Sequence, residues 1–336
     1  MPLNRSSIIK RITIVSLVLL IILIIAILAA LAIGSTSTGI MPVYHALFDH
    51  EDANAMTSAI ILHLRLPRAL LAALVGAALS LGGLVFQAIL RNPLAEPYIL
   101  GISGGSAIGA IIGILMGLSR FPGVSLLSFT GSLIILFLIV IISSGHSILK
   151  KDSLLLAGVM VNSFCSAVIM FLISMTQDSR LHNIMFWLMG DLSLADVNQA
   201  GILAAILLPC FILIFLLSNS MNILLLGKEM ALTMGISVKV ITLTLLITTS
   251  LMVSATVSNC GLVGFVGLVI PHILRLSLGS DHRVLVPACI LGGGAYMVIC
   301  DLMARTLPEQ GEMPAGVITA MIGAPIFIFL LKKSKI

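Results

Sequence analysis

Long apolar runs, broken by glycine, proline and charged residues, recur along the whole chain. A helix needs about 20 mostly apolar residues to cross the roughly 30 Å hydrocarbon core of a membrane. The pattern therefore predicts an all-α polytopic membrane protein with about ten transmembrane helices in one domain, residues 1–336. The predicted spans cover residues 12–33, 70–90, 99–118, 126–142, 154–174, 197–217, 240–258, 262–278, 284–303 and 315–331.

The composition agrees with the apolar pattern. Of the 336 residues, 59% are hydrophobic and 9% are charged, and the mean hydropathy is +1.22. An average soluble chain carries roughly 25% charged residues. No soluble catalytic domain fits between the spans, and residues 12–33 form a longer run than the roughly 7–15 residues of a signal peptide core.

The basic residues predict which side of the membrane each end faces. An even number of spans puts both termini on one side, and basic residues at both ends make that side the cytoplasm. Thirteen of the 18 lysines and arginines then lie on cytoplasmic loops or ends. They are Arg5, Lys10, Arg11, Arg91, Lys150, Lys151, Lys228, Lys239, Arg275, Arg283, Lys332, Lys333 and Lys335.

Five arginines fall on the external side, against this bias. Arg120 and Arg180 are interpreted as anchors to lipid headgroups, the usual role of a lone external arginine. Arg65 and Arg68 are three residues apart on one helix face, and no acidic residue is nearer in sequence than Asp52 or Glu96. An acidic partner surface is therefore an alternative to headgroup anchoring for this pair.

Five glycines in the third predicted span recur at every fourth position. Such a ladder gives a helix a stripe without side chains, on which another helix can pack closely. A smooth wall beside a translocation path is the alternative interpretation. The ladder consists of Gly101, Gly105, Gly109, Gly113 and Gly117.

Several other chemistries find little support. The stretch "GISGG" matches the G-x-S-x-G motif of hydrolases, but it opens an apolar helix rather than a strand-turn-helix. The five cysteines are isolated in or beside apolar runs, and the histidines are scattered, so no metal site is predicted. The basic residues do not gather on one face, which argues against a nucleic-acid partner.

The source of energy is a separate question. The thirteen acidic residues lie in loops or near span ends, with Asp301 and Glu96 closest to membrane depth. An ion-coupled secondary transporter, which remains the alternative class, usually carries charged residues inside the membrane. The chain also lacks the phosphate-binding motif G-x-x-x-x-G-K-[ST]. Any ATP hydrolysis would therefore take place on another subunit.

Four stretches together carry a family resemblance. They are "RLPRALLAALVGAALSLGGLVFQAILRNPLAEPYILGISGGSAIGA" at 65–110, "GLVGFVGLVIPHILRLSLGSDHRVLVP" at 261–287, "DLMAR" at 301–305 and "EMPAGVITAMIGAPIFIFLL" at 312–331. The chain resembles the FecCD-type permeases of ABC importers for iron-siderophore, haem and vitamin B12, and the match covers nearly the whole chain.

The resemblance implies a type II ABC importer permease fold in a bacterial inner membrane. It implies a second permease subunit, with a homodimer expected, two cytoplasmic ATPases and an external solute-binding protein. The expected cargo is a metal chelate, an iron-siderophore or haem, with vitamin B12 as the alternative. The chain is not expected to be an enzyme or to bind a cofactor, because ATP and Mg would be held by the partner ATPase.

The resemblance also assigns residues to roles. Docking of the binding protein is expected at Arg65, Arg68 and Arg305, although Arg305 has the alternative of pairing with Asp301 four residues earlier on its own helix. A polar segment at 219–239 resembles the part that contacts the ATPase, at Gly227, Lys228, Glu229, Ala231 and Gly235. A cytoplasmic gate, or plain interhelical turns, is expected at Asn92, Pro93, Leu94, Lys151, Asp152 and Ser153.

Overall fold

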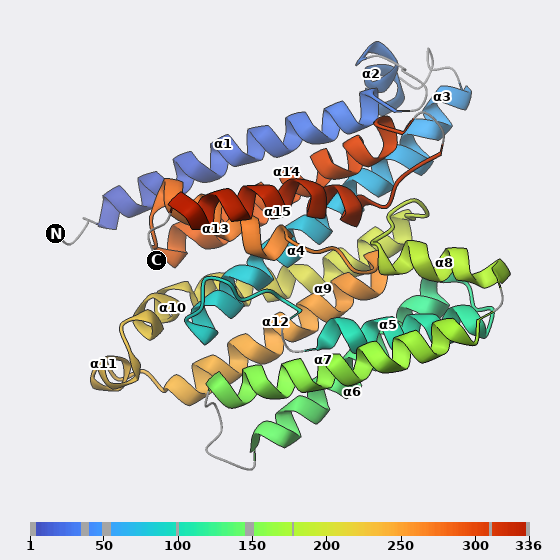
Figure 1. Ribbon diagram of the computed structural model, residues 1–336. Helices are drawn as coiled ribbons and strands as arrows, with labels where there is room; N and C mark the ends of the chain where they lie inside the picture. The colour runs from blue at the N-terminus through green and yellow to red at the C-terminus, as the bar shows by residue number, and fades with distance from the viewer. Residues whose placement is uncertain are drawn as a thin grey trace.

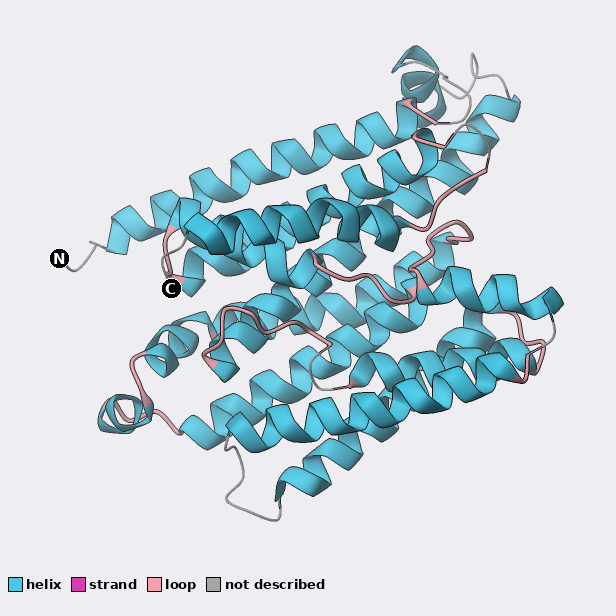
Figure 2. Ribbon diagram, in the orientation of Figure 1, coloured by secondary structure: helices cyan, strands magenta, loops and turns pink. Residues whose placement is uncertain are grey.

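The computed structural model describes residues 5–34, 40–48, 55–98, 101–144, 151–176, 178–308 and 311–333, and every regular element within them is helical (Figure 2). Each predicted span contains one helix. These helices are α1 (Arg5–Ala32), α4 (Leu66–Leu90), α5 (Ile102–Leu115), α6 (Ser125–Ser144), α7 (Lys151–Ser174), α9 (Val197–Leu216), α12 (Val238–Cys260), α13 (Val266–Leu278), α14 (His282–Thr306) and α15 (Ala315–Lys333).

Shorter elements connect these helices at the two ends of the bundle. They are α2 (Ile40–Phe48), α3 (Ala55–Ile60), the π-helical turns η1 (Ile61–Arg65) and η2 (Arg120–Val124), α8 (Asp178–Leu188), α10 (Ser218–Leu225) and α11 (Lys228–Thr233). Figure 1 shows α1 beginning and α15 ending at the same end as α10 and α11, which we call the terminal end. The distal end carries α2, α3 and α8.

Seven helical segments of the described chain are long and apolar enough to cross a membrane, whereas α5, α13 and the apolar part of α15 are shorter. The third and eighth predicted spans are thus longer than the helices observed there. Gly101 and Gly117 flank α5 with φ of 71° and 74°, and Phe265 precedes α13 with φ of 67°. Left-handed backbone of this kind cannot continue an α-helix, so both helices begin after a non-helical stretch.

Helix α4 lies at the centre of the bundle. In its most apolar window 83% of residues are buried, compared with 17% in α1 and in α7. Its most extensive helix neighbour is α14. A Cβ atom at Gly76 of α4 would overlap the backbone of Gly293 in α14, and a Cβ at Gly293 would overlap Gly76 and Ser80. The two backbones are therefore in direct contact in the middle of the molecule.

The glycine ladder divides into a packed part and two turn residues. A Cβ at Gly105 or Gly109 would overlap the backbone of α6, at Gly131 and Leu127 respectively. Gly113 is close to the end of η2, just before α6, since its Cβ would lie 3.2 Å from Val124 Cα. Gly101 and Gly117 lie outside α5, so the expectation of a five-glycine helical stripe was wrong at its two ends.

The outer helices present large apolar side chains to their surroundings. Phe164, Met170 and Phe171 of α7 and Phe137 of α6 are all more than half exposed. These helices are long enough to span a membrane. Lipid or a second subunit is the environment that removes such surfaces from water.

Candidate functional site

Three arginines and two acids meet at the distal end, where α1 ends, α4 begins and α14 ends. We call Arg65, Arg68, Asp301, Arg305 and Glu312 the arginine cluster. The three arginines are only 5% to 7% exposed and Asp301 is 1% exposed. With three guanidinium groups and two carboxylates, the cluster carries one excess positive charge.

The guanidinium groups are held by partners within the same chain. Arg68 Nε donates to the two oxygens of Asp301 at 3.0 and 3.2 Å, and Arg68 Nη1 donates to Glu312 Oε2 at 2.5 Å. Arg305 Nε forms an ion pair with Asp301 Oδ2 at 3.2 Å. Arg65 Nη1 donates to the Leu31 carbonyl at 2.7 Å, and Arg305 Nη2 to the Ala30 carbonyl at 3.3 Å.

Arg68 thus has two acidic partners within the chain, although no acid lies near it in sequence. Its partners Asp301 and Glu312 are 233 and 244 residues away in sequence and reach it only through the packing of α4 on α14. The pairing of Arg305 with Asp301, given above as the alternative, is present. Of the two acids only Glu312 has an exposed side chain, at 42%. It marks the solvent edge of the cluster.

The segment 219–239, the coupling segment, projects from the terminal end as α10, α11 and the residues that follow (Figure 1). Gly227 and Gly235 bracket α11 with φ of 116° and 77°, values that a side chain disfavours. Glu229 is exposed and Ala231 is buried. The side chain of Lys228 lies outside the described residues.

The coupling segment is less polar at its surface than its charges indicate. Four large apolar side chains within it are each more than half exposed, namely Leu226, Met230, Leu232 and Met234. They lie beyond the ends of the spanning helices α9 and α12, so the hydrocarbon core does not cover them. Exposed apolar residues gathered in this way are typical of a protein interaction surface.

The predicted gate residues lie on the link from α4 to α5 and at the start of α7. Asn92 Oδ1 accepts from the Leu94 backbone N–H at 3.0 Å and so stabilises the turn. Pro93 and Leu94 are exposed. Lys151, Asp152 and Ser153 form the first turn of α7, and their side chains lie outside the described residues.

The link continues into the bundle and meets the break before α13. Tyr98 Oη donates to the Val263 carbonyl at 2.9 Å and accepts from the Val263 N–H at 3.2 Å. Burial raises the pKa of Glu96, and the Phe265 N–H only partly opposes this effect. The two non-helical stretches thus satisfy each other's polar groups inside the bundle.

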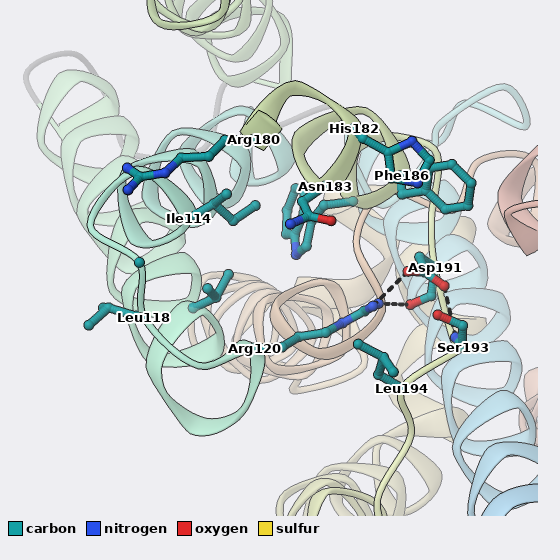
Figure 3. A pocket seen from close by; sticks show the side chains of 13 residues that line it. Ile114, Leu118, Arg120, Arg180, His182, Asn183, Phe186, Asp191, Ser193 and Leu194 are labelled. Carbon is teal, nitrogen blue, oxygen red and sulfur yellow. Dashed lines mark hydrogen bonds and ion pairs between the residues drawn. The ribbon is translucent and has the colours of Figure 1, made fainter. Parts of the chain in front are cut away.

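A pocket of about 510 Å³ lies between α5, η2, α8 and the loop after α8 (Figure 3). Within it Arg120 donates to Asp191 through Nη1 to Oδ2 at 2.6 Å and through Nη2 to the carbonyl at 2.5 Å. Burial acts to raise the pKa of Asp191, but the Arg120 guanidinium outweighs it, so the pKa lies below its ordinary value.

This ion pair corrects the interpretation of Arg120 as a headgroup anchor. Arg180 also bonds within the chain, to the Leu115 carbonyl. Sequence reasoning missed both contacts and the pocket, because the partners of Arg120 and Arg180 are 71 and 65 residues away in the chain. The only hint of these contacts in the sequence was that both arginines fall on the predicted external side, where basic residues are rare.

Comparisons with known proteins agree with this arrangement. The vitamin B12 import system permease protein BtuC of Salmonella typhi is 42% identical over 273 residues, which cover 81% of this chain and 83% of BtuC. The hemin transport system permease protein HmuU of Yersinia pestis is 37% identical over 310 residues, which cover 90% of this chain and 92% of HmuU.

Solved structures show the same fold. An inward-facing metal-chelate type ABC transporter matches with a TM-score of 0.85 at 30% identity, over 95% of this chain and 98% of that one. PsaBC from Streptococcus pneumoniae, in complex with Fab, matches with a TM-score of 0.57 at 19% identity, over 79% and 90% of the two chains. The second likeness concerns the fold alone.

The helical fold and these matches define a multi-pass membrane permease of the ABC importer class. The FecCD transport family model matches residues 22–333. The chain belongs to the FecCD transport family.

Proposed function

We propose that this permease imports a metal chelate, an iron-siderophore or haem, which an external solute-binding protein delivers. Vitamin B12 is the second candidate, because BtuC, with 42% identity, is a vitamin B12 import permease. The observation that carries the metal-chelate proposal is the match to a metal-chelate type ABC transporter over 95% of the chain. HmuU, a hemin permease, supports the same cargo class.

In this proposal all ten long or short apolar helices cross the membrane, and the terminal end faces the cytoplasm of a bacterium. The thirteen basic residues assigned to that side support this orientation. The distal end, with the arginine cluster and the pocket at Arg120, then faces outward. A second copy of the chain completes the path, and the exposed apolar face of α7 offers one surface for it.

The coupling segment is the proposed docking site for an ATPase that binds ATP and Mg. The exposed side chains of Leu226, Met230, Leu232 and Met234 support this role, because a protein partner would remove them from water. Closure of the ATPases would move the segment and switch the gate between outward-open and inward-open states. The chain itself carries out no covalent chemistry.

The arginine cluster is the proposed docking site for the binding protein. Its excess positive charge supports an acidic partner, which would replace Glu312, the exposed acid at the edge of the cluster, beside Arg68. Complementary charges at such a rim set the rate and register of association more than its affinity. An acid on the binding protein would approach Arg68 from the side on which Glu312 now lies.

Reconstitution in liposomes tests the proposal. We expect the permease with its ATPases and binding protein to take up a labelled ferric siderophore or haem only when ATP is present inside. Preferential uptake of labelled vitamin B12 would select the second candidate. Uptake by the chain alone under a proton or sodium gradient would contradict the proposal and favour an ion-coupled transporter.

A further inference from the structure

The two helices that build most of the arginine cluster are also held at their other ends by α10. Helix α4 carries Arg68, and α14 carries Asp301 and Arg305. Both helices run from the distal end to the terminal end of the bundle (Figure 1). The contacts at their terminal ends involve one short helix at the start of the coupling segment.

Asn222 of α10 forms the contact with α14. Its Nδ2 donates to Asp281 Oδ1 at 2.8 Å, and its Oδ1 accepts from the His282 backbone N–H at 2.8 Å. His282 Nδ1 lies 2.8 Å from the same oxygen. Asp281 in turn caps α14 by accepting from the Arg283 N–H at 3.0 Å. A single amide side chain therefore holds the first turn of α14.

The contact with α4 comes from the residue that ends this helix. Arg91 has φ of 48° and its Nη2 donates to the Leu224 carbonyl of α10 at 2.7 Å. Leu224 is two residues from Asn222 on the same helix. Helix α10 thus holds the ends of α4 and α14 together.

The same two helices are joined at two further levels. The backbones of Gly76 and Gly293 touch in the middle of the bundle, where no side chain separates them. At the distal end Arg68 of α4 is paired with Asp301 of α14 at 3.0 Å. With joints at both ends and in the middle, the two helices cannot slide past each other without breaking a contact.

We propose that α4 and α14 move as one unit between the arginine cluster and the coupling segment, and that Asn222 is the positioning residue through which α10 follows that unit. The inference rests on the proposed function, because it links the two proposed docking sites. Contiguity alone does not establish coupling, so the test has to measure coupling itself.

The test uses the complete permease–ATPase complex in proteoliposomes, with its binding protein free of cargo as the probe. Three quantities are measured, namely the affinity for the binding protein, the basal ATPase rate and the stimulation of that rate by the binding protein. Docking in the wild type is established first. Its absence there would contradict the proposed function, whatever the variants do.

Asn222→Asp is the decisive variant. It places a second carboxylate against Asp281 and removes the amide donor. We expect stimulation, taken relative to the basal rate of the same variant, to fall at least about fivefold, which corresponds to about 1 kcal/mol. The affinity for the binding protein should stay within about twofold. Asn219→Asp is the matched control. It adds the same charge at an exposed position of the same helix and should leave stimulation intact.

An exchange of the two residues separates positioning from folding. In Asn222→Asp combined with Asp281→Asn, an amide again faces a carboxylate, and both backbone N–H groups of α14 keep an acceptor. We expect this double variant to recover at least half of the stimulation. Normal stimulation in Asn222→Asp, or a double variant no better than the single one, would overturn the proposal. So would a loss in Asn219→Asp equal to that in Asn222→Asp.

Discussion

The two ends of the molecule differ in what they bury and what they expose. The distal end buries three arginines and supplies most of their partners from within the chain, whereas the coupling segment exposes four large apolar side chains. Buried charge is stable only when paired, and exposed apolar surface persists where a partner covers it. The distal surface can therefore stand alone, while the terminal surface is incomplete without a second protein.

The largest effect is expected when Asp301, the carboxylate shared by Arg68 and Arg305, is removed. Asp301→Ala leaves Arg68 and Arg305 buried without it, and loss of one partner of a buried ion pair costs about 3 to 5 kcal/mol. We expect a loss of this size in the free energy of unfolding in detergent. Glu312→Gln is the control, because its partly exposed pair contributes at most about 1 kcal/mol. Equal losses in both variants would show that burial does not distinguish the two acids.

Charging the apolar surface tests the other end. Met230→Asp combined with Met234→Asp should weaken ATPase binding at least about tenfold, which corresponds to 1.4 kcal/mol and is less than the burial of two methionines can contribute. The unfolding of the isolated permease should not change, because both side chains are exposed. Met230→Leu combined with Met234→Leu, which keeps both side chains apolar, is the control for co-purification. Undiminished ATPase recovery with the methionine double variant would place the interface elsewhere.

Glu312→Gln also sharpens the docking proposal. Removing this acid raises the excess positive charge of the cluster and frees one donor of Arg68, so an acidic binding protein should bind about two- to fivefold more tightly. The gain should shrink at high salt, because exposed charges are screened over about 8 to 10 Å at physiological ionic strength. Binding measured at two salt concentrations checks this. An unchanged affinity at low salt would exclude Arg68 from the interface.

The smallest effect concerns the pH dependence of the α14 cap. Burial opposes ionisation of Asp281, but hydrogen bonds from Arg283 and Asn222 lower its pKa to about 2. The contribution of ionised Asp281 to the stability of the fold is therefore fully present above a pH of about 3.9, the pKa of an aspartate in the unfolded chain. It is lost as the pH falls towards 2. Stability measured between pH 6 and pH 3 should decrease less in Asp281→Asn than in the wild type, by about 1 kcal/mol at most. Identical pH profiles would contradict this assignment.

Apolar periodicity predicted the helices well because each run is a local property of the sequence. Helix boundaries failed where left-handed residues intervene, at Gly101, Gly117 and Phe265. The phenylalanine could not have been anticipated, since only the packing around α13 holds it there. The ion pairs of Arg68 and Arg120 were not predicted, for a different reason. They join residues far apart in the chain, and charge bias reports sidedness but not neighbours.

The candidate site was predicted unevenly. The coupling segment was found by resemblance. The sequence analysis described it as polar, and only the structure showed that its methionines and leucines are exposed beyond the ends of the spans. The roles given to Asn92, Leu94 and Lys151 remain predictions, because a gate is defined by motion between two states. The pocket beside Arg120 depends on four separate segments and left no local pattern.

The shortness of α5 and α13 has a consequence for how the chain enters the membrane. At 1.5 Å per residue their 14 and 13 residues span only about 20 Å, well short of the roughly 30 Å of hydrocarbon. Neither helix can stop in the bilayer as an independent unit with its flanking backbone unsatisfied. Each depends on another segment: α5 packs closely on α6, which follows it, and the stretch before α13 bonds to the hydroxyl of Tyr98, which precedes it in the chain. The place of these two helices in the membrane is therefore fixed by packing and hydrogen bonds between segments, and not by the length of each helix alone.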